Sequence, residues 1–161
     1  MVVHKLNIDE FEADSFSLIA IYTNLEDFRL AYFINLVLNL NLKKNPIDIL
    51  VNTLDGETNF TSFVFENLKQ EISWNLFQNK SEISYSNKDL NLNLFSDLNI
   101  QTTKKVFILP EFKKVDFFLK IDHQEDINLV EIVKNINKID RISSVNSIEI
   151  SKIKNKNNLI F

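Results

Sequence analysis

The chain of 161 residues contains no cysteine and a single glycine, Gly56. Without cysteine it can form no disulfide, no thiolate nucleophile and no zinc ribbon or iron–sulfur site. Loops that cradle phosphate need several glycines, because backbone N–H groups must approach the anion closely. Neither a P-loop nor a dinucleotide-binding fingerprint can therefore be written in this sequence.

Arginine and long apolar runs are also scarce. The formal net charge is -4, and Arg29 and Arg141 are the only arginines. Nucleic-acid binding depends on clustered Lys and Arg, so nucleic acid is a disfavoured partner. No stretch approaches the about 18 apolar residues of a membrane span, and the opening MVVHKLNIDEFEAD matches no secretory signal. We expect a cytoplasmic protein without a membrane partner.

The sequence offers few residues for histidine chemistry. His4 and His123 are the only imidazoles, and neither has an acidic or histidine neighbour at ligand spacing. We therefore expect no metal site and no Ser-His-Asp triad, and we name no cofactor and no catalytic residue.

The apolar residues that are present suffice for one core. A chain of this length is typical of one domain, so we expect a single α+β domain over residues 1–161. Residues 80–105 are rich in Ser, Asn and Lys without a sustained period, which predicts an irregular surface excursion. The sheet is expected to be mostly antiparallel, with two main helices.

Apolar and alternating runs predict the strands. The run Phe16–Tyr22 is apolar throughout and is expected to be buried on both faces. An Asp55-Gly56 pair indicates a turn. The other expected strands are Val3–Ile8, Leu38–Lys44 with a continuation over 47–51 after Pro46, a hairpin of Phe60–Glu66 and Glu71–Phe77, Val106–Leu109, Val115–Asp122 and Val145–Ile150.

The first helix is expected to begin at Asn24 as N-cap, with Asp27 completing a capping box. Its main apolar stripe consists of Leu30, Phe33, Ile34 and Val37. A second set of apolar side chains lies off that stripe, so we expect protein to cover both flanks, a second subunit being one candidate. These are Phe28, Tyr32, Leu36 and Leu40.

The second helix is expected after Asn128 and Glu131, which form a capping pair. With the strands on either side it makes a C-terminal strand-helix-strand unit of ferredoxin-like style. The final residues Leu159-Ile160-Phe161 are apolar after a polar stretch, which indicates a docked end.

The most distinctive stretch is Phe107–Ile121, FILPEFKKVDFFLKI. It resembles the bacterial IPExxxVDY family, whose pattern matches Leu109-Pro110-Glu111, three residues, then Val115-Asp116-Phe117. Leu109 stands in place of Ile, and Phe117 stands in place of Tyr, which removes a phenol hydroxyl. The helix start LEDFRLAYFIN and the terminal NLIF are similar to that family as well. The family has no assigned activity, so the resemblance implies no function.

The motif has a functional and a structural interpretation. Pro110 fixes φ and suits the first corner of a turn, while Glu111 and Asp116 project from that turn and the following strand. In the functional interpretation these carboxylates contact a ligand or partner, together with Arg29. In the structural one, which we favour, Glu111 accepts hydrogen bonds from backbone N–H groups at the turn, and Asp116 pairs with a lysine or with Arg29.

Three functions follow from these residues. We favour a non-enzymatic binding protein that presents the Pro110–Asp116 turn or the aromatic flank of the first helix to a protein partner or a second copy. The alternatives are a small-ligand regulatory domain, suggested by the C-terminal unit, and an enzyme using Glu111, Asp116 and Arg29. A concave pocket lined by those three side chains would favour the alternatives, whereas a flat apolar patch would favour a protein partner.

Overall fold

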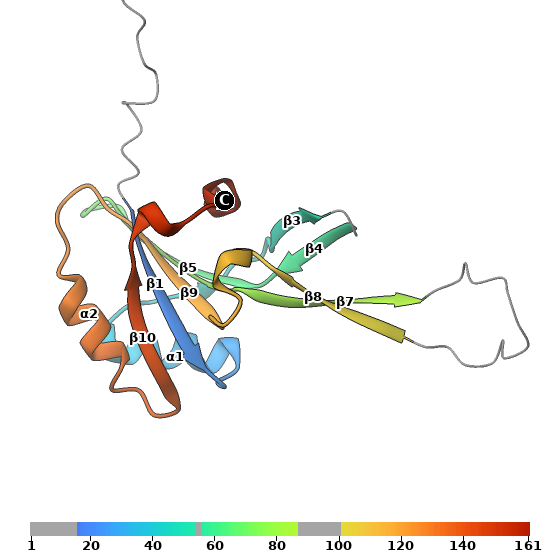
Figure 1. Cartoon of the computed structure of the whole chain (residues 1–161). Helices are drawn as coiled ribbons and strands as arrows, with labels where there is room; N and C mark the ends of the chain where they lie inside the picture. Colours follow the sequence, from blue (N-terminus) through green and yellow to red (C-terminus); the bar gives the residue numbers. More distant parts are fainter. Residues whose placement is uncertain (1–15, 54–55, 87–100) are drawn as a thin grey trace, which may run out of the picture.

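The computed structural model of the chain describes residues 16–53, 56–86 and 101–161 (Figure 1). Its centre is a six-stranded sheet in which every pairing is antiparallel. The predicted α+β class, with a mostly antiparallel sheet and two helices, is confirmed. In spatial order the strands are β10 (Ile142–Ile148), β1 (Phe16–Thr23), β9 (Phe117–Asp122), β6 (Ile72–Gln78), β5 (Ser62–Asn67) and β2 (Lys43–Lys44).

Strand β1 has core on both faces, as its continuous apolar sequence predicted. Ile19 and Ile21 belong to the cluster on one face, and Leu18 and Ala20 belong to the cluster on the other. Side chains of a strand alternate between faces, so a strand covered on both sides needs apolar residues at consecutive positions.

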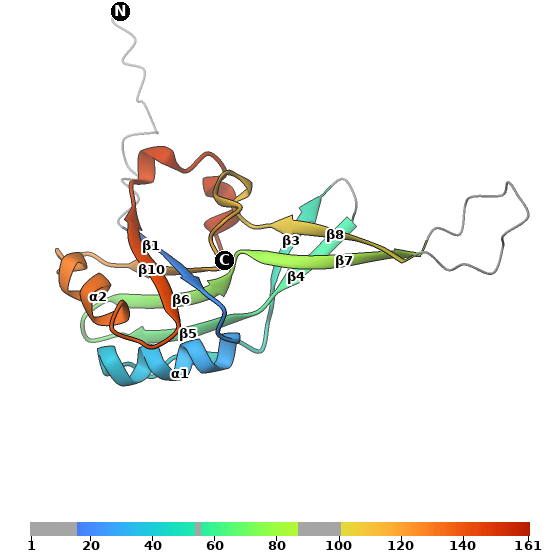
Figure 2. The same cartoon turned by 60° about the horizontal axis from the view of Figure 1, so that its bottom comes forward.

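Both helices cover the same face of the sheet, α1 (Asp27–Leu38) and α2 (Leu129–Ile136) (Figures 1 and 2). The helical period brings Leu30 and Ile34 of α1 to this face, where both are fully buried. They pack in one cluster with side chains of five strands of the sheet, among them Ile19, Phe63, Trp74, Leu76, Leu119 and Val145.

The opposite face is closed by hairpins and by the C-terminal segment instead of helices (Figure 2). The hairpins are β3 (Ile49–Thr53) with β4 (Gly56–Phe60), and β7 (Lys80–Ser86) with β8 (Gln101–Phe107). The C-terminal segment contains the 3₁₀ helices η3 (Ile150–Lys152) and η4 (Lys156–Leu159). Leu159 is 2% exposed in this second cluster, so the expected docking of the chain end is confirmed at that residue.

The two helix starts differ in how well the sequence predicted them. Asn128 caps α2 as expected, its side chain accepting a hydrogen bond from the Glu131 N–H at 3.2 Å. The expected cap of α1 is wrong, because the N-cap is Glu26 and makes no side-chain cap bond. The N–H of Leu25 is bound by Thr23 Oγ1 at 3.1 Å, so the chain is still turning away from β1 at Asn24.

The strand expected over Leu38–Lys44 is mostly wrong. Helix α1 continues through Leu38 and ends at Asn39, whose φ of 52° is left-handed. The Asn35 amide then binds both backbone groups of Leu42, donating to its carbonyl at 3.1 Å and accepting from its N–H at 2.7 Å. These two side-chain hydrogen bonds compete with strand pairing, so only Lys43–Lys44 pairs with β5.

The excursion expected over residues 80–105 is not irregular at its ends. Strands β7 and β8 pair from Lys80 opposite Phe107 to Ser86 opposite Gln101, and the hairpin projects from the body in Figure 1. Cross-strand pairing therefore orders a polar segment that carries no clear period. Strand β4 was likewise not predicted.

Other expectations shift or fall outside the described residues. The strand over Val3–Ile8 and residue Asp55 of the expected turn lie outside them. The strand expected from Val115 begins at Phe117, and the last strand runs over Ile142–Ile148. The C-terminal unit is present as β9, α2 and β10 with β1 between its strands, while its ferredoxin-like style stays a prediction. No helix of the described residues is long and apolar enough to cross a membrane.

Candidate functional site

The predicted motif forms the loop that connects β8 to β9. Pro110 opens a short 3₁₀ helix, η2 (Pro110–Phe112), where its fixed φ suits the first position. The N–H of Phe112 binds the carbonyl of Leu109, and the N–H of Val115 binds the carbonyl of Phe112, both at 3.0 Å. Glu111 therefore lies inside the first of two consecutive tight turns, and Asp116 directly follows the second.

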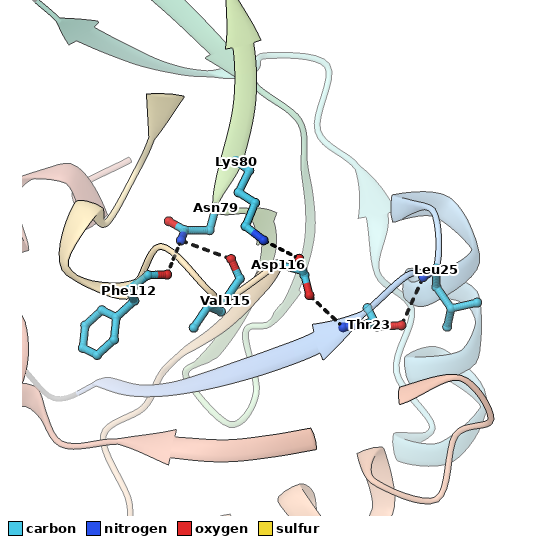
Figure 3. A network of polar contacts seen from close by, with 7 residues as sticks. All are labelled: Thr23, Leu25, Asn79, Lys80, Phe112, Val115 and Asp116. Atoms are coloured by element: carbon cyan, nitrogen blue, oxygen red, sulfur yellow. Dashed lines mark hydrogen bonds and ion pairs between the residues drawn. The ribbon is translucent and has the colours of Figure 1, made fainter. Parts of the chain in front are cut away.

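Asn79 holds this loop from inside (Figure 3). Its side chain is fully buried, and its amide nitrogen donates to the carbonyls of Phe112 at 2.9 Å and Val115 at 3.2 Å. Its amide oxygen accepts from the Leu109 N–H at 2.9 Å. The main chain of Asn79 also binds both sides of the loop, to Ile108 and to Asp116. One side chain thereby satisfies three loop groups that would otherwise be buried without partners.

Asp116 connects the loop to the end of β1. Its Oδ2 accepts from the Thr23 N–H at 3.0 Å, and its Oδ1 forms an ion pair with Lys80 Nζ at 2.7 Å (Figure 3). The two side chains of the ion pair are 30% and 35% exposed, so the pair itself contributes about 0–1 kcal/mol. Leaving the N–H of buried Thr23 without a partner costs about 1–3 kcal/mol, so that bond matters more.

Glu111 binds the C-terminal segment. Its Oε1 accepts from the backbone N–H groups of Lys154 at 2.7 Å and Asn155 at 3.1 Å, and its Oε2 accepts from Asn155 Nδ2 at 2.8 Å. One more hydrogen bond joins the same two parts of the chain, from Asn158 Nδ2 to the Ile108 carbonyl at 2.7 Å. The loop thus holds the segment whose Ile153 and Leu159 fill the second cluster.

These contacts lower the pKa of Glu111. Desolvation of the carboxylate is the largest single effect and raises the pKa, but the hydrogen bonds from the Asn155 side chain and from backbone N–H groups together outweigh it. The pKa therefore lies below its ordinary value of 4.5.

The predicted site residues do not converge on one pocket in the described structure. Glu111 faces the C-terminal segment and Asp116 faces Thr23 and Lys80, while Arg29 is exposed on α1. Phe117 is 5% exposed in the helix-side core, where its ring packs without a hydroxyl to satisfy. Both carboxylates make contacts of the structural kind, and Glu111 binds backbone of the distant segment as well as of its own turn.

His123 has a partner that the sequence did not indicate. Its Nε2 lies 2.9 Å from Ser17 Oγ, and its Nδ1 lies 2.8 Å from the Glu125 carbonyl oxygen. The third member of this set is a backbone carbonyl, so it is not the Ser-His-Asp arrangement. Among the described residues no group of three His, Asp or Glu side chains is placed to hold a metal ion.

One open depression of about 530 Å³ includes a predicted residue, Asp116. Its lining includes neither Glu111 nor Arg29 and consists of Thr23, Asn24, Asp116, Arg141, Ile142 and Ser143. Sequence reasoning missed the parts of Asn79, Lys80, Thr23 and Arg141. Asn79 and Lys80 follow the predicted strand Glu71–Phe77 after one intervening glutamine. Their partners are about 30 residues away in sequence.

We expect Asn79→Ala to destabilise the fold by about 2–4 kcal/mol, because it leaves the Leu109 N–H and two loop carbonyls unpaired in a buried site. Urea unfolding at neutral pH measures this. The matched control is Asn146→Ala, at an exposed asparagine bonded only to Ser144 in the described structure, with an expected change within about 0.5 kcal/mol. Equal effects of the two substitutions would contradict the part assigned to Asn79.

We expect Glu111 to make stability depend on acid pH. Its pKa is lower in the folded protein than in the unfolded chain, so the unfolded chain binds more protons below pH 4.5. The stabilisation is complete above that pH and is lost as pH falls through the folded pKa. The difference in unfolding free energy between the native chain and Glu111→Gln should therefore be constant above pH 4.5 and shrink below it.

The control for this pH series is Glu149→Gln, at a carboxylate whose ion pair with Lys152 at 3.2 Å is 70% exposed on the glutamate side. Its stability should follow that of the native chain at every pH. A gap between the native chain and Glu111→Gln that stays the same down to pH 3 would show that the Glu111 contacts do not depend on its charge.

Comparison of the chain with protein-family models, with curated proteins and with solved structures gave no match. The resemblance to the IPExxxVDY family thus depends on sequence patterns alone, namely the motif, the helix start and the terminal NLIF. The candidate site is defined by geometry: a loop held by Asn79, the two carboxylates that this loop carries, and a depression beside Asp116.

Proposed function

We propose that this chain is a non-enzymatic protein-binding domain whose contact surface is the outer face of α1. That face consists of Phe28, Arg29, Tyr32 and Leu36. The observation that supports the proposal is the exposure of its apolar side chains: 57% for Phe28, 59% for Tyr32 and 61% for Leu36. These residues recur at every fourth position, so they form one continuous stripe on the side of the helix opposite the core.

The size of the stripe suits a moderate interaction. Large side chains of this kind bury 150–250 Å² each when covered, so together these three leave on the order of 300 Å² exposed. Covering that area gains about 7 kcal/mol before the cost of association, which is of similar size. The stripe therefore needs additional contacts, and Arg29 beside it offers a charged one.

Arg29 also favours a different protein over a second copy of this chain. Its side chain makes no hydrogen bond or ion pair within the described part of the chain, and it lies on the exposed face of α1. If two α1 helices paired antiparallel about Tyr32, Arg29 of one copy would face Asn35 of the other and find no carboxylate. The partner that fits is an apolar protein surface with a carboxylate opposite Arg29.

The enzyme alternative has less support. The enzyme hypothesis needs Glu111, Asp116 and Arg29 together, and the described contacts of the two carboxylates point to different parts of the fold.

We also propose, from the resemblance of its motif, that the chain is a cytoplasmic bacterial protein of the IPExxxVDY family. The contacts of Glu111 and Asp116 support this, because they give the spacing of the motif a physical reason.

The test is site-specific photo-crosslinking. A benzophenone side chain replaces Tyr32 in the full chain, the lysate of the source cells is irradiated, and the adduct is identified by mass spectrometry. We expect one partner, which is then purified. Tyr32→Ser and Arg29→Glu should each weaken its affinity at least tenfold without lowering the Tm, because both side chains are exposed.

The matched control is Val130, which is 80% exposed but belongs to α2 and not to the stripe on α1. A crosslinker there should give no adduct with the partner, and Val130→Ser should leave the affinity unchanged. Equal crosslinking from positions 32 and 130 would contradict the proposal. An adduct between two copies of the chain would replace the proposed partner with a homodimer, which light scattering would confirm.

A further inference from the structure

The depression beside Asp116 is built from three separate parts of the chain. Thr23 and Asn24 lie where β1 ends, Asp116 lies in the motif loop, and Arg141 and Ser143 lie where β10 begins, Arg141 in the turn before it. Thr23 connects them, because its N–H binds Asp116 and its hydroxyl donates to the Arg141 carbonyl at 2.9 Å. The walls are therefore held in place by the buried structure beneath them.

Arg141 stands at this depression in a left-handed conformation with φ of 67°. A residue with a Cβ adopts that conformation at a cost that glycine avoids. Asn39 and Glu71 share it, so the conformation alone does not single out Arg141. All three lie where an element ends or at a turn before a strand, and Arg141 differs from the other two in lining the depression.

The lining holds one negative and one positive side chain, and only the negative one, Asp116, has a charged partner in the described structure. The carboxylate of Asp116 is already engaged by Lys80 Nζ at 2.7 Å and by the Thr23 N–H at 3.0 Å (Figure 3). The side chain of Arg141 is exposed and has no recorded contact within the described part of the chain. Asn24 and Ser143, both exposed, add an amide and a hydroxyl that can donate hydrogen bonds.

We propose that this depression binds a small ligand through an oxyanion, a carboxylate or a phosphate, held by Arg141 with Asn24 and Ser143 as neutral donors. A guanidinium presents its donors in a planar fork that matches two oxygens of such a group. The side chain of Ile142 gives the site an apolar wall, and the free lone pairs of Asp116 can accept from a ligand hydroxyl. No residue of this lining belongs to the outer face of α1.

The test is a titration of the isotope-labelled full chain with inorganic phosphate and, separately, with acetate, at constant ionic strength. We expect saturable amide shifts that cluster at residues 23–24 and 141–143. The tighter of the two probes identifies the oxyanion. Arg141→Gly, which suits the left-handed backbone, should weaken binding at least tenfold while the Tm stays equal or rises. Arg141→Asn, also compatible with that backbone, should do the same.

Arg29→Ala is the matched control, because Arg29 is the only other arginine and lies outside the depression. It should leave the affinity and the shifts unchanged. Unsaturated shifts spread over the lysines would mean an adventitious ion only and would overturn the proposal. So would Arg141→Gly and Arg141→Asn variants that bind both probes as well as the native chain, or an equal loss in Arg29→Ala.

Discussion

The buried amide of Asn79 is the contact on which the candidate site depends. A polar side chain with no exposure must have its hydrogen bonds made inside the protein, and Asn79 makes them to Leu109, Phe112 and Val115. The backbone of the loop is therefore fixed at both ends of η2. From this fixed loop Glu111 extends to the C-terminal segment and Asp116 extends to β1. One amide thus positions two long-range connections, of which that of Glu111 holds the C-terminal segment over the sheet's second face.

The same arrangement explains why the motif has its particular residues. Pro110 begins a turn, the three residues after Glu111 complete the two tight turns, and Val115 enters the second core cluster before the strand starts. Phe117 then enters the opposite cluster, and a tyrosine there would bring a hydroxyl that needs a partner. This spacing places Val115 and Phe117 in the clusters on opposite faces, with Glu111 inside the first turn and Asp116 directly after the second.

Local patterns predicted the elements whose cause is local. The apolar run of β1 gave a strand with two buried faces, and Asn128 with Glu131 gave the start of α2. Errors arose where a distant or side-chain contact decided the outcome, as with Asn24 at α1 and Asn35, which holds Leu42 away from a strand. The sequence contains many asparagines, and nothing in the neighbouring residues distinguishes the buried Asn79 from the exposed ones. Lys80 and Arg141 were missed because their positions depend on pairing between segments far apart in sequence.

Thr23 lies between the two proposed binding surfaces. Its hydroxyl accepts from the Leu25 N–H, two residues before α1, and donates to the carbonyl of Arg141, while its N–H binds Asp116. A movement of Arg141 on ligand binding would act on that hydroxyl and hence on the entry to α1. If a ligand at Arg141 changes the affinity of the outer face of α1, linkage requires the protein partner to change the ligand's affinity by the same factor. Thr23→Ser keeps the hydroxyl and should preserve such coupling, whereas Thr23→Val removes it and should separate the two sites.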